Sequence, residues 1–175
     1  GQGYVLTSPL QLAVMTARIA TGREVTPRLI RLIDGVTQPS GLGESLGINE
    51  NTLRRVRASM NDVCNHRRGT AYRSRIIDDA HKMAGKTGTS QVRRITPVGF
   101  APYDNPRYAV SVVVEHGGGG SAAAAPIARD ILLQAQYGGP PPLEAYPAEV
   151  RDRIAEQQSR IEARIPPGAK GRSRV

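Results

Sequence analysis

The spacing of apolar residues predicts that the chain begins with a buried helix. Ser8 can cap this helix, Pro9 fits its first turn, and Gln11 stands where the second partner of a capping box belongs. The helix should run to about Thr21, with Gly22 as its stop signal. Because most of its faces are apolar, we expect it to be buried.

Two further core helices follow from the same periodicity. One starts near Asn49 and ends at Gly69, and it carries an apolar stripe made of Leu53, Val56, Met60 and Val63. The other starts at Ser121 or Ala125, with Pro126 in its first turns. Its residues predicted to pack on a sheet are Ile127, Ile131 and Leu132.

Extended segments are predicted at residues 25–33, 83–93 and 107–115, with a loop at 37–47. The third of these segments is apolar on both alternating faces, which is typical of a strand covered on both sides. Helices and hairpin-connected strands in this order predict an α+β fold with helices packed on an antiparallel sheet.

The last part of the chain has a different composition. Residues 137–142 are rich in glycine and proline and indicate a linker, and residues 147–165 predict an amphipathic helix that needs a partner. The final basic residues are typical of a disordered tail. We therefore divide the chain into a core at 1–137 and a tail at 138–175.

The net charge is +9, and seven arginines but one acid lie between Arg54 and Arg75. Nucleic-acid binding is not favoured, because Phe100 is the only phenylalanine, tryptophan is absent, and no recognised motif occurs. A solvated basic face is the simplest interpretation, and a face near anionic lipid or acidic cell-wall polymer is the alternative. The single cysteine, Cys64, is predicted to be buried, and no metal site or cofactor is expected.

The strongest chemical signal is Lys86-Thr87-Gly88-Thr89-Ser90. On a strand, Thr87 and Thr89 share one side, while Gly88 allows another backbone or a ligand to approach. An ammonium, two hydroxyls and free N–H groups suit an extended peptide that ends in a carboxylate. The short motif is weak evidence when taken alone.

The context of this motif resembles the second half of the transpeptidase domain of class B penicillin-binding proteins, above all the elongation-specific type 2 proteins. The most specific likeness is the opening Gly1-Gln2-Gly3-Tyr4, followed by Thr7-Ser8-Pro9-Leu10-Gln11-Leu12-Ala13. Gly99-Phe100-Ala101-Pro102 and His116-Gly117-Gly118 come later in the matching order. The resemblance runs from residue 1 to about residue 137 and implies the fold shared with serine β-lactamases.

The resemblance also implies a reaction. A serine attacks a D-Ala-D-Ala bond of a peptidoglycan stem peptide, and an amine resolves the acyl-serine into a cross-link; β-lactams trap the acyl-enzyme. By this resemblance, Lys86 would be a catalytic residue that supplies a positive charge. The substrate would be bound by Thr87, Gly88 and Thr89, and the backbone N–H of Thr89 would be an oxyanion-hole donor. Implied partners are stem peptides, β-lactams, a membrane glycan polymerase and other elongation-complex proteins. The implied location is the periplasmic face of a bacterial inner membrane, with the anchor upstream.

Two departures from the family pattern matter. No Ser-x-x-Lys occurs in a plausible position, and Ser59-Met60-Asn61 spells Ser-x-Asn in the wrong place, so we expect the nucleophile outside this chain. Between Arg94 and Val98 a few residues stand where the family usually has a longer connection, so either this loop is deleted or residues of the protein are missing from this sequence. The alternatives are a β-lactamase or D,D-carboxypeptidase of the same fold, and a non-enzymatic basic binding module.

Overall fold

The computed structural model describes residues 6–30, 32–38, 41–88, 94–95, 97–115 and 120–164. The helices are α1 (Pro9–Thr21), α2 (Glu50–Asn65), α3 (Gly120–Tyr137) and α4 (Arg151–Arg164). The strands are β1 (Leu32–Ile33), β2 (Val36–Thr37), β3 (Ala84–Lys86), β4 (Arg94–Ile95), β5 (Val98–Ala101), β6 (Tyr108–Ser111) and β7 (Val114–Glu115). Short 3-10 turns are η1 (Tyr72–Ser74), η2 (Asp79–His81), η3 (Leu143–Ala145) and η4 (Ala148–Val150).

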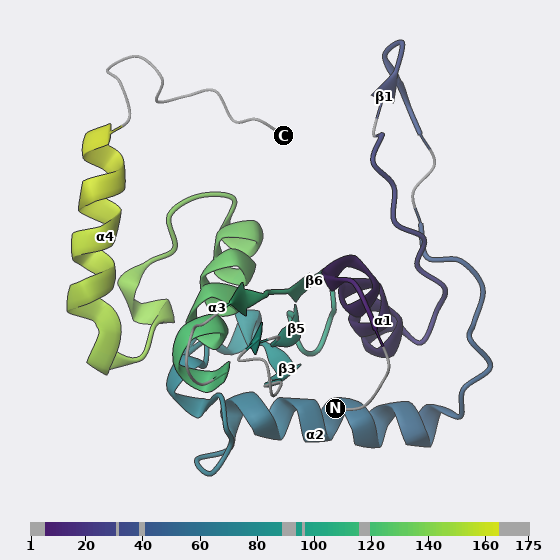
Figure 1. Cartoon of the computed structure of the whole chain (residues 1–175), viewed down its shortest axis with the longest axis horizontal. Coiled ribbons are helices and arrows are strands. Elements are labelled where there is room, and N and C mark those ends of the chain that lie inside the picture. Colours follow the sequence, from purple (N-terminus) through teal and green to yellow (C-terminus); the bar gives the residue numbers. More distant parts are fainter. Residues whose placement is uncertain are drawn as a thin grey trace.

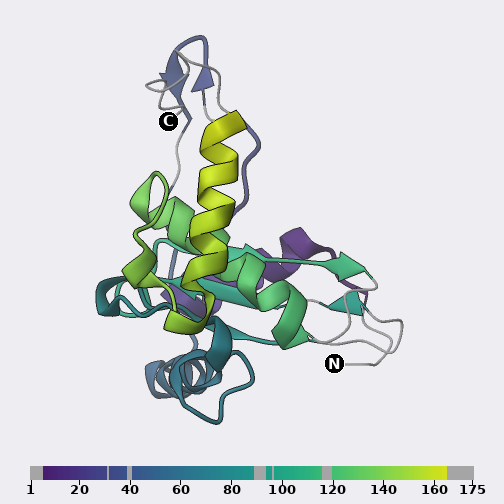
Figure 2. The ribbon, with the colours of Figure 1, turned by 90° about the vertical axis from the view of Figure 1, so that its left-hand side faces the viewer.

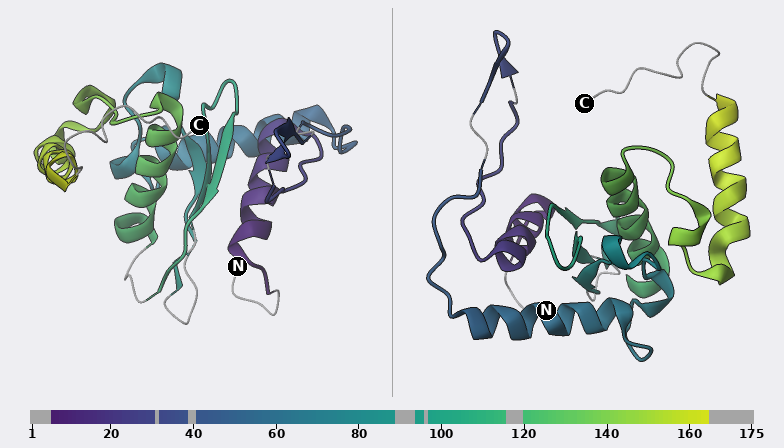
Figure 3. Two further views of the ribbon diagram at one scale, coloured as in Figure 1. Left: turned by 90° about the horizontal axis from the view of Figure 1, so that it is seen from above. Right: turned by 180° about the vertical axis from the view of Figure 1, so that it is seen from behind.

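A three-stranded antiparallel sheet in the order β3-β5-β6 forms the centre of the molecule. Helix α1 covers one face of this sheet and α3 covers the other, while α2 runs past the edge strand β3 (Figures 1 and 3). Phe100 and Ala84 face a cluster with α1 and α2, and Val110 faces a cluster with α3. The predicted α+β fold, with helices on both sides of an antiparallel sheet, is confirmed.

The caps of the first two helices agree with the sequence. Ser8 and Gln11 form the reciprocal capping box of α1, Gly22 ends that helix in the left-handed conformation, and Asn49 caps α2. However, α1 is not buried on most faces, since the side chains of Leu10 and Met15 remain 56% and 43% exposed. Only one face of α1 meets the sheet.

Helix α2 ends at Asn65, so the predicted end at Gly69 is wrong by one turn. Gly69 has another role, because its chain segment folds back onto the end of α2. A Cβ atom at this position would lie 2.3 Å from the carbonyl oxygen of Asp62 and 2.4 Å from that of Val63. Glycine is therefore required for the close approach that leads into η1.

Two predicted strands are shorter or more broken than expected. Among the described residues of 25–33, which leave out residue 31, only Leu32–Ile33 form a strand, which pairs with Val36–Thr37 in a small hairpin. The segment 107–115 is interrupted between β6 and β7. Strand β4 pairs with β7, and two residues separate β4 from β5 along the chain.

Helix α3 buries a different face from the one predicted. Leu132 is buried as expected, but Ile127 and Ile131 are 42% and 47% exposed. Small residues face the sheet instead, and Arg129 and Leu133 face the C-terminal segment. Because this segment covers a second side of α3, the buried surface of the helix is rotated away from Ile127 and Ile131.

The segment after α3 packs along this helix, and α4 stands outermost (Figures 1 and 2). Tyr146 and Ile154 are buried in the α3 cluster, and the Ile77 N–H donates to the Ala145 carbonyl over 2.9 Å. The predicted amphipathic helix thus has a packing partner. A domain boundary at residue 137 stays a prediction, and the basic tail beyond residue 164 lies outside the described residues.

Candidate functional site

The candidate site lies where the edge strand β3 ends. Lys86 is the last residue of this strand, its side chain is exposed, and its ammonium donates to the Thr87 carbonyl. Within the described part of the chain β3 pairs only with β5, so its other edge is not used by the sheet. An unpaired edge presents backbone N–H and C=O groups that an extended peptide can bind.

Gly85 sets the tight pairing beneath the site. It lies opposite Gly99 in the register, and a Cβ atom at Gly85 would be 2.5 Å from the Val98 carbonyl oxygen. A side chain here would push β3 away from β5. The two facing glycines therefore set the spacing between β3 and β5, and with it the position of the Lys86 backbone.

Thr70 joins the site from the connection after α2. Its hydroxyl lies 2.8 Å from the hydroxyl of Thr87, which is half-buried. The backbone before β3 is also anchored, because the Asn65 amide donates to the Met83 carbonyl over 2.9 Å. The sequence analysis did not predict this contact, because it joins residues far apart in the chain.

The sequence-predicted site residues are only partly described. Lys86, Thr87 and Gly88 follow one another at the end of β3. Thr89 and Ser90 lie outside the described residues, so the proposed oxyanion-hole N–H stays a prediction. Ser59 and Asn61 lie on α2 and make local bonds, to the Arg55 carbonyl and from the Asn65 amide.

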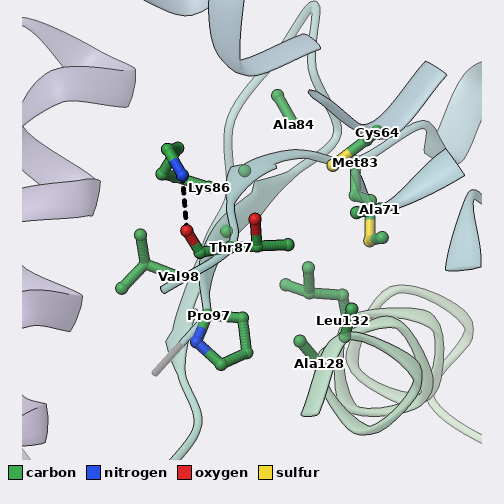
Figure 4. A pocket seen from close by; sticks show the side chains of 13 residues that line it. Cys64, Ala71, Met83, Ala84, Lys86, Thr87, Pro97, Val98, Ala128 and Leu132 are labelled. Atoms are coloured by element: carbon green, nitrogen blue, oxygen red, sulfur yellow. Dashed lines mark hydrogen bonds between the residues drawn. The ribbon is translucent and has the colours of Figure 1, made fainter. Parts of the chain in front are cut away.

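A small apolar cavity lies behind this strand (Figure 4). Its volume is about 20 Å³, and Cys64, Met83 and Leu132 are among its lining residues. Burial raises the pKa of the Cys64 thiol to about 12, so this cysteine stays protonated. A space of this size and polarity suits no substrate, because it holds one water molecule at most. The unpaired edge of β3, and not this cavity, is therefore the candidate binding surface.

A wider apolar groove of about 560 Å³ lies between α1 and α2 and reaches Lys86. Met15, Ile19, Val56 and Met60 contribute to its lining. Lys86 is thus an ammonium group at the end of an apolar surface. A charge in such a position interacts more strongly with a ligand once water is displaced.

A second polar cluster connects η2 to α3. The Tyr137 hydroxyl donates to the Asp78 carboxylate, the His81 ring nitrogen lies 2.6 Å from the same carboxylate, and the two rings stack at 4.4 Å. The hydrogen bond from Tyr137 is the largest cause that lowers the pKa of Asp78, followed by contacts with His81 and the Ala80 N–H. These groups bond and stack on one another and link η2 to α3, so we assign the cluster a structural role.

This cluster predicts a pH dependence of stability. The pKa of Asp78 is lower in the folded chain than in the unfolded one, so its contribution is present above about pH 4 and is lost as pH falls through the folded value. When the pH falls from about 5 to about 3, the free energy of unfolding should decrease less for Asp78→Asn than for wild type. Urea unfolding at several pH values measures this, with the exposed neighbour Asp79→Asn as control. Parallel pH profiles for wild type and Asp78→Asn would contradict it.

Among the described residues no helix is long and apolar enough to cross a membrane. In the same part of the chain no group of three or more His, Cys, Asp and Glu residues is arranged to hold a metal ion.

Residues 1–133 match the model of the penicillin binding protein transpeptidase domain. The chain is 29% identical over 191 residues to the peptidoglycan D,D-transpeptidase MrdA of Haemophilus influenzae, covering 94% of this chain and 29% of that protein. It is 33% identical over 143 residues to MrdA of Acinetobacter baumannii, covering 67% of this chain and 20% of that protein.

The same family appears among solved structures. The Pseudomonas aeruginosa PBP2 in complex with WCK 5153 matches with a TM-score of 0.67 and 36% identity, covering 78% of this chain and 32% of that one. The Helicobacter pylori PBP2 matches with a TM-score of 0.61 and 36% identity, covering 78% and 25%. The chain thus spans less than a third of the length of these relatives.

The alignments also contain a gap of consistent size. The Haemophilus alignment has 191 positions, whereas 94% of the 175-residue chain is about 165 residues, so about 26 positions are gaps in this chain. The Acinetobacter alignment has 143 positions for about 117 residues, again a difference of about 26. A shortened connection ahead of Val98 would produce such a difference. The family model, these relatives and the matching structures show that the chain belongs to the transpeptidase domain family of penicillin-binding proteins, of the PBP2 (MrdA) type.

Proposed function

We propose that this chain forms the substrate-holding half of a peptidoglycan D,D-transpeptidase domain. The observation that carries the proposal is the position of Lys86 and Thr87 at the end of an edge strand, with Thr70 bonded to Thr87. The edge of β3 offers backbone partners to a stem peptide, and Lys86 offers a positive charge to its terminal carboxylate. The matches to proteins named peptidoglycan D,D-transpeptidase MrdA support the same reaction.

The proposed reaction has two steps. A serine oxygen attacks the carbonyl carbon of the D-Ala-D-Ala bond, the bond to nitrogen breaks, and D-alanine leaves with a proton on its amine. An amine of a neighbouring stem peptide then attacks the resulting ester, and the serine recovers its proton. The Thr89 N–H would stabilise the negative oxygen in both steps, and the hydroxyls of Thr87 and Thr89 would bind the substrate carboxylate.

The attacking serine belongs, in this proposal, to a part of the protein outside the 175 residues. The apolar groove between α1 and α2 supports this arrangement, since it reaches Lys86 and exposes side chains such as Met15. We propose that the other part of the transpeptidase domain covers this groove. Covering it would remove water from around Lys86 and strengthen the attraction of its ammonium for a carboxylate.

We further propose that the protein works at the periplasmic face of the inner membrane, during cell-wall elongation. Its expected ligands are stem peptides and β-lactams, and its expected partners are a membrane glycan polymerase and other proteins of the elongation complex. One solved structure of the Helicobacter pylori relative is a complex with MreC. That complex shows that a protein of this family assembles with another protein.

Covalent labelling tests the proposed function. We expect the intact protein, with the rest of its transpeptidase domain, to bind a fluorescent penicillin at one serine, and the 175-residue chain to remain unlabelled. Gel fluorescence and mass spectrometry of the labelled peptide measure both results. Labelling of a serine within the 175 residues would overturn the position assigned to the nucleophile. Rapid hydrolysis of the acyl-enzyme would instead indicate a β-lactamase.

A further inference from the structure

A second cavity lies on the other side of Thr70. It has a volume of about 480 Å³ and lies between the α2–η1 connection, the first half of α3, and the η4–α4 segment. Four arginines line it, namely Arg67, Arg73, Arg129 and Arg153, together with the hydroxyl-bearing residues Thr70 and Ser121. No aspartate or glutamate is among its lining residues. The cavity therefore concentrates positive charge.

Arg129 is the unusual member of this set. Its side chain is fully buried, its Nε donates to the Asp130 carboxylate over 2.8 Å, and Nη2 lies 2.8 Å from the same oxygen. Within the described residues, however, Nη1 has no partner, and Nη2 has only the ion pair with Asp130. A buried guanidinium with unused donors is costly, and native proteins almost always supply an acceptor.

The surroundings hold Arg129 in place. The Tyr146 ring lies 5.0 Å from its guanidinium carbon, and burial raises the pKa of this tyrosine to about 12, so it stays a neutral ring. Tyr146 belongs to the C-terminal segment, as does Arg153. The segment that covers α3 thus both buries Arg129 and adds a further arginine to the cavity.

We propose that this cavity binds a phosphate or diphosphate group. A guanidinium presents a planar fork of donors that matches phosphate oxygens, and Arg129 has free donors for such an acceptor. Asp130 balances only one of the four positive charges, which favours a multiply charged anion over a single carboxylate. The group is either a free ion or the head group of an anionic lipid.

Isothermal titration of the 175-residue chain with inorganic pyrophosphate tests the proposal. We expect saturable binding at one site, and we expect Arg67→Gln and Arg153→Gln each to weaken it about tenfold. Arg68→Gln and Arg160→Gln are matched controls, because each removes the same charge from the same segment outside the cavity lining. We expect each control to change the affinity less than about twofold.

Absence of saturable binding would overturn the proposal. Equal weakening of pyrophosphate binding by all four variants would also overturn it, because this would indicate general attraction to a basic chain. Arg129→Met should abolish binding while circular dichroism remains unchanged. If this variant does not fold, the comparison of Arg67 and Arg153 with their controls still decides. The binding assay needs no acylation, so its outcome is independent of the proposed transpeptidase reaction.

Vesicles distinguish the two sources of the phosphate. We measure co-sedimentation with phosphatidylcholine vesicles that do or do not contain phosphatidylglycerol. In one outcome the chain sediments only with vesicles that contain phosphatidylglycerol, and both pyrophosphate and Arg153→Gln reduce this sedimentation. That result supports the site with a lipid head group as its ligand. Binding of pyrophosphate without sedimentation supports the site with a free ion as ligand.

Discussion

Replacing Lys86 by alanine in the intact protein should slow acylation by a fluorescent penicillin about 100- to 1,000-fold. Lys86 ends the edge strand β3 and places an ammonium beside the apolar groove between α1 and α2. A β-lactam carries a carboxylate that this charge would attract, and the same charge would stabilise proton transfer during attack. Removing one electrostatic group of a preorganised site commonly costs this much in rate.

Lys82→Ala provides the matched control, because Lys82 lies four residues earlier and forms an ion pair with Asp79 over 2.8 Å. It removes the same charge outside the site and should leave the acylation rate within about twofold, since exposed ion pairs contribute little. Stopped-flow labelling kinetics measure both variants. An unchanged rate in Lys86→Ala would exclude the role proposed for Lys86. Equal slowing in both lysine variants would point to general electrostatics.

The second large effect concerns Phe100. Its side chain is fully buried on β5, in a cluster with Ala20 of α1, Met60 of α2 and Ala84 of β3. Phe100→Ala should lower the free energy of unfolding by about 3 to 5 kcal/mol, since it removes the largest fully buried side chain of this cluster. Urea denaturation followed by circular dichroism measures the loss.

Ile131→Ala is the informative comparison for Phe100. The apolar pattern predicted that Ile131 packs on the sheet, whereas the structure leaves it 47% exposed on α3. Its truncation should therefore cost less than about 1 kcal/mol. If Ile131→Ala lowered the free energy of unfolding as much as Phe100→Ala, Ile131 would have to pack on the sheet, as the apolar pattern predicted.

Local signals in the sequence were sufficient for several features. Ser8, Gln11 and Gly22 gave the limits of α1 correctly, because capping depends on residues within one turn. The fold class and the family followed from the order of motifs, and the match over residues 1–133 confirmed the family. Lys86, Thr87 and Gly88 were proposed as a site from their residue types and context, and this stays a prediction.

Features that join distant segments could not be predicted in this way. The hydrogen bond between Thr70 and Thr87 links residues 17 positions apart, and no local pattern encodes it. Residues 25–33 looked like a strand, but only Leu32–Ile33 found a partner. A strand needs a neighbour to bond its backbone, so alternation of side chains is insufficient.

The sequence alone thus determined where α1 and α2 start and to which family the chain belongs, because these depend on short stretches of residues. Only the tertiary structure decided which side of α3 is buried and why Arg129 lies inside the molecule. Both follow from the segment after residue 137, which packs back onto α3. Burial is a property of surfaces that meet in space, and a pattern along one helix does not contain the second surface.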